Sequence, residues 1–204
     1  HADDKLTKTV HPLQAGGRIV SFNDNHILLS IGDYGHLYLA QDNERVNGSI
    51  IKININNNNY EIISIGHRNP QGLYFDKENN FILETEHGPK GGDEINLIEV
   101  DKISKSEPLN YGWAIVSAGK HYAGKTEANE NLYKKYPLYN SHSEYGFIEP
   151  LKSFGPLIGI SEITKIGQNK YVASSLKDKS LYFFELDNEK KIINLEREEV
   201  FERV

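Results

Sequence analysis

Short apolar segments recur every eight to twelve residues along much of this sequence, and this rhythm limits the possible fold more than any other feature. Segments of this length, separated by Gly, Asn and Asp, are typical of strands in antiparallel meanders. Hardly any helical periodicity accompanies them, so the sequence predicts an all-β protein. The spacing suits a sandwich, a barrel or a propeller, and periodicity alone does not separate the three. The predicted strands are 18–22, 26–31, 49–55, 72–75, 81–84, 95–100, 159–166, 170–174, 180–186 and 191–195.

A sequence pattern that is repeated within the chain favours the propeller. FNDNHILLSIGD at 22–33 and FDKENNFILETEHG at 75–88 share an aromatic residue, a polar turn, an apolar strand and then a polar loop. YFFELDNEKKIINL at 182–195 repeats the hairpin part, with its turn predicted at Asp187 and Asn188. A repeated hairpin whose apolar strand ends in a polar loop is typical of propeller blades, because the inner strands of the blades end on one axial face.

Composition excludes several classes of function. The chain has 204 residues, of which 38% are hydrophobic and 25% charged, as in an ordinary globular protein. A net charge of −6 without a basic stripe argues against binding nucleic acid. The sequence contains no run of eighteen apolar residues, so no membrane span is predicted. The absence of cysteine excludes disulfides, thiolate metal sites and thiol nucleophiles. Small molecules or proteins are the expected partners.

The loop HRNPQG at 67–72 has the chemistry of a binding site. Pro70 keeps the preceding residue out of the helical region, and Gly72 permits a tight return. Arg68, Asn69 and Gln71 are therefore held in preset directions. A guanidinium group suits carboxylates, and side-chain amides donate or accept beside it. The alternative interpretation is a structural turn in which Arg68 pairs with a local acid.

A second loop, EHGPKGGDEIN at 86–96, is rich in glycine. Without Cβ atoms in the way, its carbonyl groups can point inward. Backbone oxygens together with a carboxylate are ligands for hard cations, and calcium is the natural occupant. Asp93 and Glu94 either contribute to such a site or begin the next strand as solvated charges.

Taken together, these loops and four further motifs carry a family resemblance. The chain resembles the soluble quinoprotein glucose/sorbosone dehydrogenases, six-bladed β-propellers that include PQQ-dependent aldose sugar dehydrogenases. The resemblance implies that the chain covers about four of the six blades. The motifs are AGGRIV at 15–20, LLSIGD at 28–33, GHRNPQGL at 66–73, EHGPKGGDEINLI at 86–98, NYGW at 110–113 and SSLKDKSLY at 174–182.

The resemblance also implies roles for particular residues. PQQ carries three carboxylates on a planar ring, so its site needs cations, amide donors and a divalent ion on one surface. In the family's reaction, hydride passes from C1 of an aldose sugar or related alcohol to the quinone, in a periplasmic or secreted protein. The implied cofactor-binding residues are Arg68, Asn69, Gln71, Lys177, Phe154 and Arg203. The carbonyls of Gly88 and Pro89 are the implied calcium ligands, with Asp93 and Glu94 as further metal candidates.

The sequence departs from the family pattern at the catalytic base. The family's histidine stands four residues before the Arg of the GGR element, and counting back from Arg18 gives Gln14. A carboxamide cannot act as a general base. His11, three residues further upstream, is the alternative base if the loop is bulged. The predicted catalytic residues are therefore Gln14, His11 and Arg68. Phe154 stands in place of a family tryptophan, and its ring is expected to cover the cofactor.

The expected organisation is a single partial propeller domain over 1–204, lacking N-terminal blades and the end of the last blade. Open sheet edges invite pairing, so the expected protein partner is a complementary propeller segment or another copy of the chain. In the polar stretch 120–146, Tyr133, Tyr136 and Tyr139 either stack on a sugar or belong to a surface loop.

Three hypotheses of function remain open. The first is PQQ- and calcium-dependent sugar oxidation, impaired by Gln14. The second is a non-catalytic propeller that binds a partner and retains the fold and a calcium site. The third is a calcium-dependent propeller hydrolase, which needs a cluster of metal-binding carboxylates that the sequence does not display.

Overall fold

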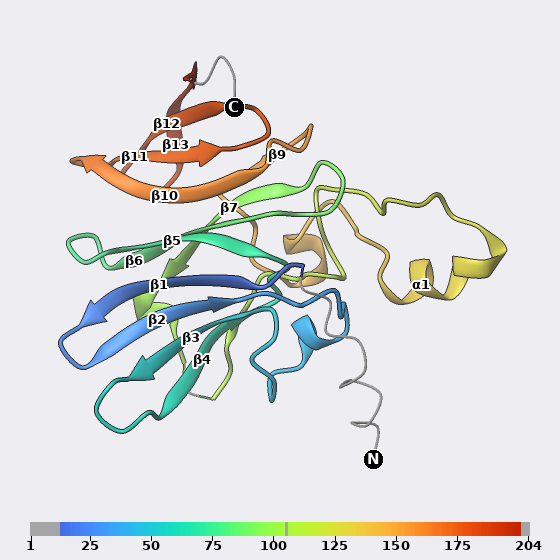
Figure 1. The fold of residues 1–204 in the computed structure, drawn as a ribbon, viewed down its shortest axis with the longest axis horizontal. Coiled ribbons are helices and arrows are strands. Elements are labelled where there is room, and N and C mark those ends of the chain that lie inside the picture. Colours follow the sequence, from blue (N-terminus) through green and yellow to red (C-terminus); the bar gives the residue numbers. More distant parts are fainter. Residues whose placement is uncertain (1–12, 105, 201–204) are drawn as a thin grey trace.

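The computed structural model describes residues 13–104 and 106–200, and the strands in this part of the chain form three sheets (Figure 1). The first sheet has the order β1-β2-β3-β4-β8, the second β5-β6-β7-β9 and the third β10-β11-β12-β13. Neighbouring strands are antiparallel except for β4 and β8. The strands are β1 (Gly16–Asn23), β2 (His26–Ile31), β3 (Ser49–Asn54), β4 (Tyr60–Ile65), β5 (Pro70–Asp76), β6 (Phe81–Glu86), β7 (Asp93–Glu99), β8 (Leu109–Asn110), β9 (Lys152–Phe154), β10 (Ile160–Gly167), β11 (Lys170–Ser175), β12 (Ser180–Leu186) and β13 (Ile192–Glu199).

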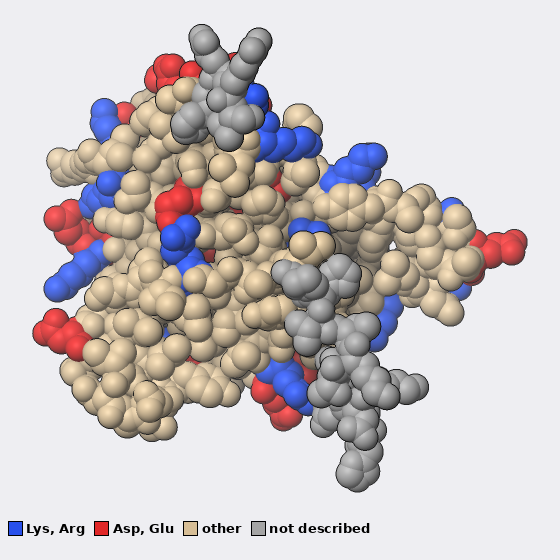
Figure 2. Space-filling model, viewed as in Figure 1, with Lys and Arg blue, Asp and Glu red and all other residues tan. Residues whose placement is uncertain are grey.

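Helical structure is sparse, as the sequence predicted. One short α-helix lies in a segment that projects away from the sheets, to the right in Figure 1. In the part of the chain that the structure describes, no helix is long and apolar enough to cross a membrane. On the face drawn in Figure 2, acidic and basic side chains are interspersed rather than gathered in a basic stripe. The helices are η2 (Leu39–Gln41), η3 (Val100–Lys102), η4 (Glu127–Asn129), α1 (Glu130–Lys135) and η5 (Ser143–Tyr145).

The all-β prediction is confirmed. Strands β2 and β12 have the predicted bounds, and the other predicted strands differ from the observed ones by a few residues at their ends. Three strands, β4, β8 and β9, were not predicted. The described residues form three meander sheets, whereas about four blades were expected.

The second sheet is buried on both faces. Its first strand, β5, lies between β1 and β10, the first strands of the other two sheets (Figure 1). Along β6, Ile82 packs into the core shared with the first sheet, while Phe81 and Leu83 pack into the core shared with the third. Because both faces of β6 are covered, every residue of the strand is buried, and its apolar residues do not alternate with exposed polar ones.

Hydrogen bonds join the loops at one end of the three sheets. The backbone N–H of Gly16, at the start of β1, donates to the Asn69 side chain just before β5 (3.2 Å). The N–H of Asp33, after β2, donates to the carbonyl of Arg68 (2.9 Å). The N–H of Ile160, at the start of β10, donates to Asp93 (3.1 Å). Polar loops distant in the sequence therefore meet at one end of the sheets.

At the opposite end of β5, Asp76 makes a buried link to the third sheet. Its carboxylate accepts hydrogen bonds from Tyr171 (2.6 Å), Asn79 (2.9 Å) and Lys165 (3.3 Å). Burial alone raises the pKa of Asp76, but these hydrogen bonds outweigh it and lower the pKa to about 2.

The Asp76 link predicts a pH-dependent stability. Because the pKa of the folded state lies below the unfolded value, the stabilisation is present above pH 4 and is lost as the pH falls towards 2. We expect Asp76→Asn to lower the free energy of unfolding by about 2 kcal/mol at pH 7, and the difference from wild type to shrink between pH 4 and pH 2. Urea denaturation at pH 7, 4 and 2 measures this. A difference that stays constant with pH would contradict it.

Candidate functional site

A pocket of about 290 Å³ lies where the polar loops meet. Gln14 comes from the segment before β1, Arg68 from the loop before β5, Pro89 from the loop between β6 and β7, and Trp113 from the segment after β8. The projecting segment closes the pocket from the outside with residues 121–123, 129, 132 and 133. The pocket therefore combines amide, guanidinium and aromatic groups from loops that are far apart in the sequence.

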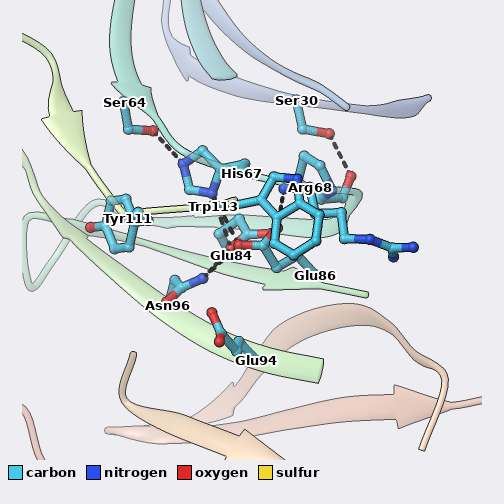
Figure 3. A network of polar contacts seen from close by, with 12 residues as sticks. Ser30, Ser64, His67, Arg68, Glu84, Glu86, Glu94, Asn96, Tyr111 and Trp113 are labelled. Atoms are coloured by element: carbon cyan, nitrogen blue, oxygen red, sulfur yellow. Dashed lines mark hydrogen bonds and ion pairs between the residues drawn. The ribbon is translucent and has the colours of Figure 1, made fainter. Parts of the chain in front are cut away.

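Arg68 is held in one direction and is only 7% exposed. Its Nη1 donates to the carbonyls of His87 (2.9 Å) and Gly88 (2.8 Å). The guanidinium carbon lies 5.4 Å from the centre of the Trp113 ring, within the range of a cation–π contact. Its backbone N–H donates to Glu86 (2.5 Å). Figure 3 shows Arg68 and Trp113 side by side at the edge of a buried polar network.

Gln14 bridges Arg68 and a buried acid, Asp33. With the amide oriented so that each atom faces a complementary partner, Oε1 accepts from Nη2 of Arg68 (2.7 Å) and Nε2 donates to Oδ1 of Asp33 (2.6 Å). The indole N–H of Trp113 donates to the other oxygen of Asp33 (2.7 Å). Burial raises the pKa of Asp33, and the hydrogen bonds from Trp113 and Gly35 oppose that shift.

Asp33 and the second role of Trp113 were missed by the sequence analysis. Asp33 closes the motif LLSIGD, and an acid at the end of an apolar strand was the available signal. Trp113 was recognised only as part of the motif NYGW. It is 6% exposed and packs in a small core cluster, yet it also lines the pocket.

His121 is a third pocket residue that the sequence analysis did not single out. Its Nε2 lies 2.7 Å from the carbonyl oxygen of Tyr136. A carbonyl oxygen only accepts, so Nε2 is the donor in this contact. The ring packs on Tyr133, with 4.4 Å between ring centres. Of the three tyrosines considered as sugar platforms, Tyr133 lines the pocket, while Tyr136 is buried and Tyr139 stacks on another tyrosine.

The glycine-rich loop turns as its sequence suggests. A Cβ on Gly88 would lie 1.6 Å from the carbonyl oxygen of Gly92, so only glycine fits there. The carbonyl of Gly88 accepts from Arg68 (2.8 Å), and that of Pro89 accepts from the N–H of Gly92 (3.0 Å). Each oxygen has a second lone pair, so neither bond excludes a cation.

The two carboxylates predicted beside this loop have other partners. Asp93 accepts backbone N–H groups from Gly88 and from residues 158–160, so its charge ties the loop to the start of β10. Glu94 is 5% exposed, and its Oε1 lies 3.7 Å from Nε2 of His142. Burial, together with the nearby charge of Glu86, raises the pKa of Glu94 well above its usual range. Neither carboxylate faces the pocket.

The remaining cofactor candidates are divided between the site and the core. Asn69 accepts from Gln71 (2.8 Å), so these amides brace the loop beside Arg68. Lys177 is exposed, and the described residues offer its ammonium group no hydrogen bond or ion pair. Phe154 is the exception: its ring is 7% exposed and packs edge-on against Tyr182 in the core, away from the pocket. His11 and Arg203 lie outside the described residues.

Lys177 lies next to a chain of hydrogen bonds that leads to Arg68. Its Cβ lies 2.9 Å from the position that a Cβ on Gly159 would take. The N–H of Gly159 donates to Asp93 (2.6 Å), which also binds the N–H of Gly88 (3.2 Å). The carbonyl of Gly88 in turn binds Arg68 (2.8 Å). Hydrogen bonds therefore link Arg68, Gly88 and Asp93 to Gly159, and Lys177 lies next to Gly159; Lys177 and Gly88 are not among the residues that line the pocket.

This fold and this site define an all-β protein with a polar pocket at the loop ends of its sheets. The family model for glucose/sorbosone dehydrogenases matches residues 4–204. The chain belongs to that family.

Individual relatives agree with this assignment. The uncharacterised protein slr1608 of Synechocystis sp. is 30% identical over 209 residues, which cover 88% of this chain and 47% of that protein. The aldose sugar dehydrogenase YliI of Escherichia coli is 32% identical over 122 residues, 53% of this chain and 31% of YliI. The chain thus spans half the length or less of these relatives.

A solved structure shows the same fold. The PQQ-bound aldose sugar dehydrogenase of Streptomyces coelicolor superposes with a TM-score of 0.63 at 20% identity, covering 90% of this chain and 48% of that one. At 20% identity, this similarity establishes the arrangement of the strands alone.

Proposed function

We propose that this chain forms part of a PQQ- and calcium-dependent dehydrogenase that oxidises an aldose sugar or a related alcohol. The observation that carries the proposal is the chain of hydrogen bonds that runs from Arg68, which lines the pocket, through Gly88 and Asp93 to Gly159, next to Lys177. Membership of the glucose/sorbosone dehydrogenase family supports it, as does the PQQ bound in the Streptomyces coelicolor structure.

The residues present fit this cofactor in charge and in chemistry. Arg68 and the ammonium of Lys177, which has no partner among the described residues, suit the cofactor's carboxylates, and Asn69 and Gln71 provide amides beside Arg68. The carbonyls of Gly88 and Pro89 retain lone pairs for a calcium ion. When bound, PQQ supplies a quinone that accepts a hydride. The projecting segment over the pocket would exclude water from the sugar.

The proposal extends to the architecture. We assign the three described sheets to blades of a six-bladed propeller and residues 1–204 to one partial propeller domain. The open sheets would be completed by a complementary propeller segment or by a second copy of the chain. A periplasmic or secreted location goes with this function.

A non-catalytic binding module is the second candidate, and one observation favours it. The side chain of Gln14 occupies the place between Arg68 and Asp33 with an amide, which accepts no proton at physiological pH. A chain that keeps the cofactor loops but lacks the base would bind PQQ without turning over a sugar.

Titration of the intact protein with PQQ, with and without calcium, tests the proposal. PQQ binding is expected to quench the fluorescence of Trp113, the chain's one tryptophan, because that ring lines the pocket. Removing calcium with a chelator is expected to weaken the binding. Arg68→Gln is expected to lower the affinity by about 10- to 100-fold, the worth of one charge-assisted hydrogen bond.

The control is Arg197→Gln, which removes an exposed arginine from the third sheet and should leave the affinity unchanged. Reduction of a dye in the presence of a panel of sugars then separates the two candidates. Uptake with turnover indicates the dehydrogenase, and uptake without turnover indicates the binding module. A failure of the intact protein to take up PQQ at all would refute the proposed function.

A further inference from the structure

A cluster of His67, Glu84, Glu86 and Asn96 is buried next to Arg68 (Figure 3). Glu84 and Glu86 stand two residues apart on β6, so the alternation of the strand places both carboxylates on one face. His67 reaches them from the loop before β5. His67 and Glu84 are 0% exposed and Glu86 is 3% exposed. The ligating atoms of His67 and the two glutamates all lie within 4.8 Å of one another.

The two carboxylates lack a matching positive charge. Among the described residues, Glu84 comes within ion-pair distance of one basic group, Nδ1 of His67, at 3.8 Å. The guanidinium of Arg68 points to the carbonyls of the glycine-rich loop and to Gln14 instead. Burial and the neighbouring charge of Glu86 raise the pKa of Glu84 well above its usual range. A compensating proton or cation is therefore required.

Unpartnered oxygens in the cluster are a second, separate sign of a ligand. Oε1 of Glu84 and Oδ1 of Asn96 are buried, and the described part of the chain gives neither a hydrogen-bond partner. The amide nitrogen of Asn96 donates to Glu84 (2.9 Å) and to Glu86 (3.2 Å), so the nitrogen rather than Oδ1 faces the two carboxylates. Such oxygens are rare in folded proteins without a bound water or ion.

The geometry suits a small transition-metal ion. Nδ1 of His67 lies 3.3 Å from Glu86 Oε1 and 3.8 Å from Glu84 Oε2. Ligand atoms about 2.0–2.2 Å from a tetrahedral zinc ion lie about 3.3–3.6 Å apart, so both distances from the imidazole to the carboxylates are within a few tenths of an ångström of those in such a site. Nε2 of His67 lies 2.9 Å from the hydroxyl of Ser64, the outer partner that a metal-bound imidazole usually has.

We propose that His67, Glu84 and Glu86 bind a structural divalent ion of the zinc type. An imidazole with two carboxylates favours zinc over calcium, which prefers oxygen ligands alone. A +2 ion with a neutral imidazole balances the two carboxylates. It also fixes Glu86, whose other oxygen accepts the backbone N–H of Arg68 (2.5 Å). The ion thus joins β6 to the turn that carries Arg68, and the site is separate from the calcium loop.

The test uses the intact protein, first stripped with a chelator and then given one equivalent of zinc chloride. After desalting, elemental analysis is expected to find about one zinc per chain, and zinc is expected to raise Tm relative to the stripped protein. Calcium at the same concentration should not displace it. Cobalt in place of zinc should give the visible absorption of a tetrahedral site with nitrogen and oxygen ligands.

Glu84→Gln keeps the shape of the side chain and removes its charge, and is expected to weaken zinc binding at least about 100-fold. Glu99→Gln, on the next strand of the same sheet, is the matched control and should bind as wild type does. If wild type retains no more zinc than Glu84→Gln, the proposal is overturned and a proton balances the charge. If Glu84→Gln fails to fold, the zinc-dependent Tm of wild type decides, and an unchanged Tm overturns the proposal.

Discussion

Replacing Gln14 by histidine is expected to raise the rate of sugar oxidation by the intact protein, supplied with PQQ and calcium, about 100- to 10,000-fold. That range is what a positioned general base contributes. Gln14 already points between Arg68 and Asp33, with its amide nitrogen 2.6 Å from the Asp33 carboxylate. An imidazole in that place would donate one N–H to Asp33 and present its other nitrogen to the pocket. The backbone φ of 62° at Gln14 is one that histidine tolerates better than most residues.

Steady-state dye reduction over a range of pH measures the effect. The rate of Gln14→His should rise with pH as its imidazole loses its proton, because the neutral form is the base. Gln14→Asn is the matched control, since it changes the side chain without adding a base, and it should stay at the wild-type rate. PQQ titration of each variant shows whether the site still loads. If all three load PQQ and Gln14→His is no faster than the others, residue 14 does not limit the reaction.

Replacing Asp93 by asparagine is expected to lower the free energy of unfolding by about 3–5 kcal/mol, the cost of breaking a buried charged network. Oδ2 accepts the backbone N–H groups of Ile158 (3.1 Å), Gly159 (2.6 Å) and Ile160 (3.1 Å), and Oδ1 accepts that of Gly88 (3.2 Å). An amide in place of the carboxylate turns an NH₂ group towards N–H donors. At least one buried donor is then left without an acceptor.

Urea denaturation followed by circular dichroism measures the loss. Asp42→Asn is the control, because Asp42 accepts a single exposed N–H from Glu44 (3.0 Å) and its replacement should cost less than about 0.5 kcal/mol. If Asp93→Asn is as stable as this control, Asp93 does not link the glycine-rich loop to the third sheet.

Sequence patterns predicted the long strands because each of these strands has its own pattern of apolar residues and is bounded by its own turn residues. The asparagine run 56–59 falls in the turn between β3 and β4, yet β4 itself was missed, since Ile62 and Ile63 are adjacent and hide its alternation. Strands β8 and β9 are only two and three residues long. They exist because they pair with β4 and β7, and no local pattern encodes such pairing.

The candidate site was recognisable in the sequence where the conformation of a loop depends on its own residues, and it was missed where the site depends on residues far away in the sequence. Pro70 and the glycines near Gly88 dictate their own turns, so the loops that carry Arg68 and the candidate calcium carbonyls were recognisable. Asp93 and Asp33 also have partners 65 and 80 residues away, and nothing near either acid in the sequence indicates these distant partners. Phe154 aligned with a cofactor-covering residue of the family, but the structure places its ring in the core.

The link through Asp93 also constrains how the chain is made. A ribosome adds about 5–20 residues per second, so the amides 158–160 follow Asp93 out of the exit tunnel after roughly 3–13 s. Until then, the N–H groups of residues 158–160, three of the four that Asp93 accepts in the native structure, have not emerged. The glycine-rich loop therefore reaches its final form only once the third sheet begins to emerge. A slow stretch of translation between the two would lengthen the time for which the incomplete chain is exposed to chaperones and proteases.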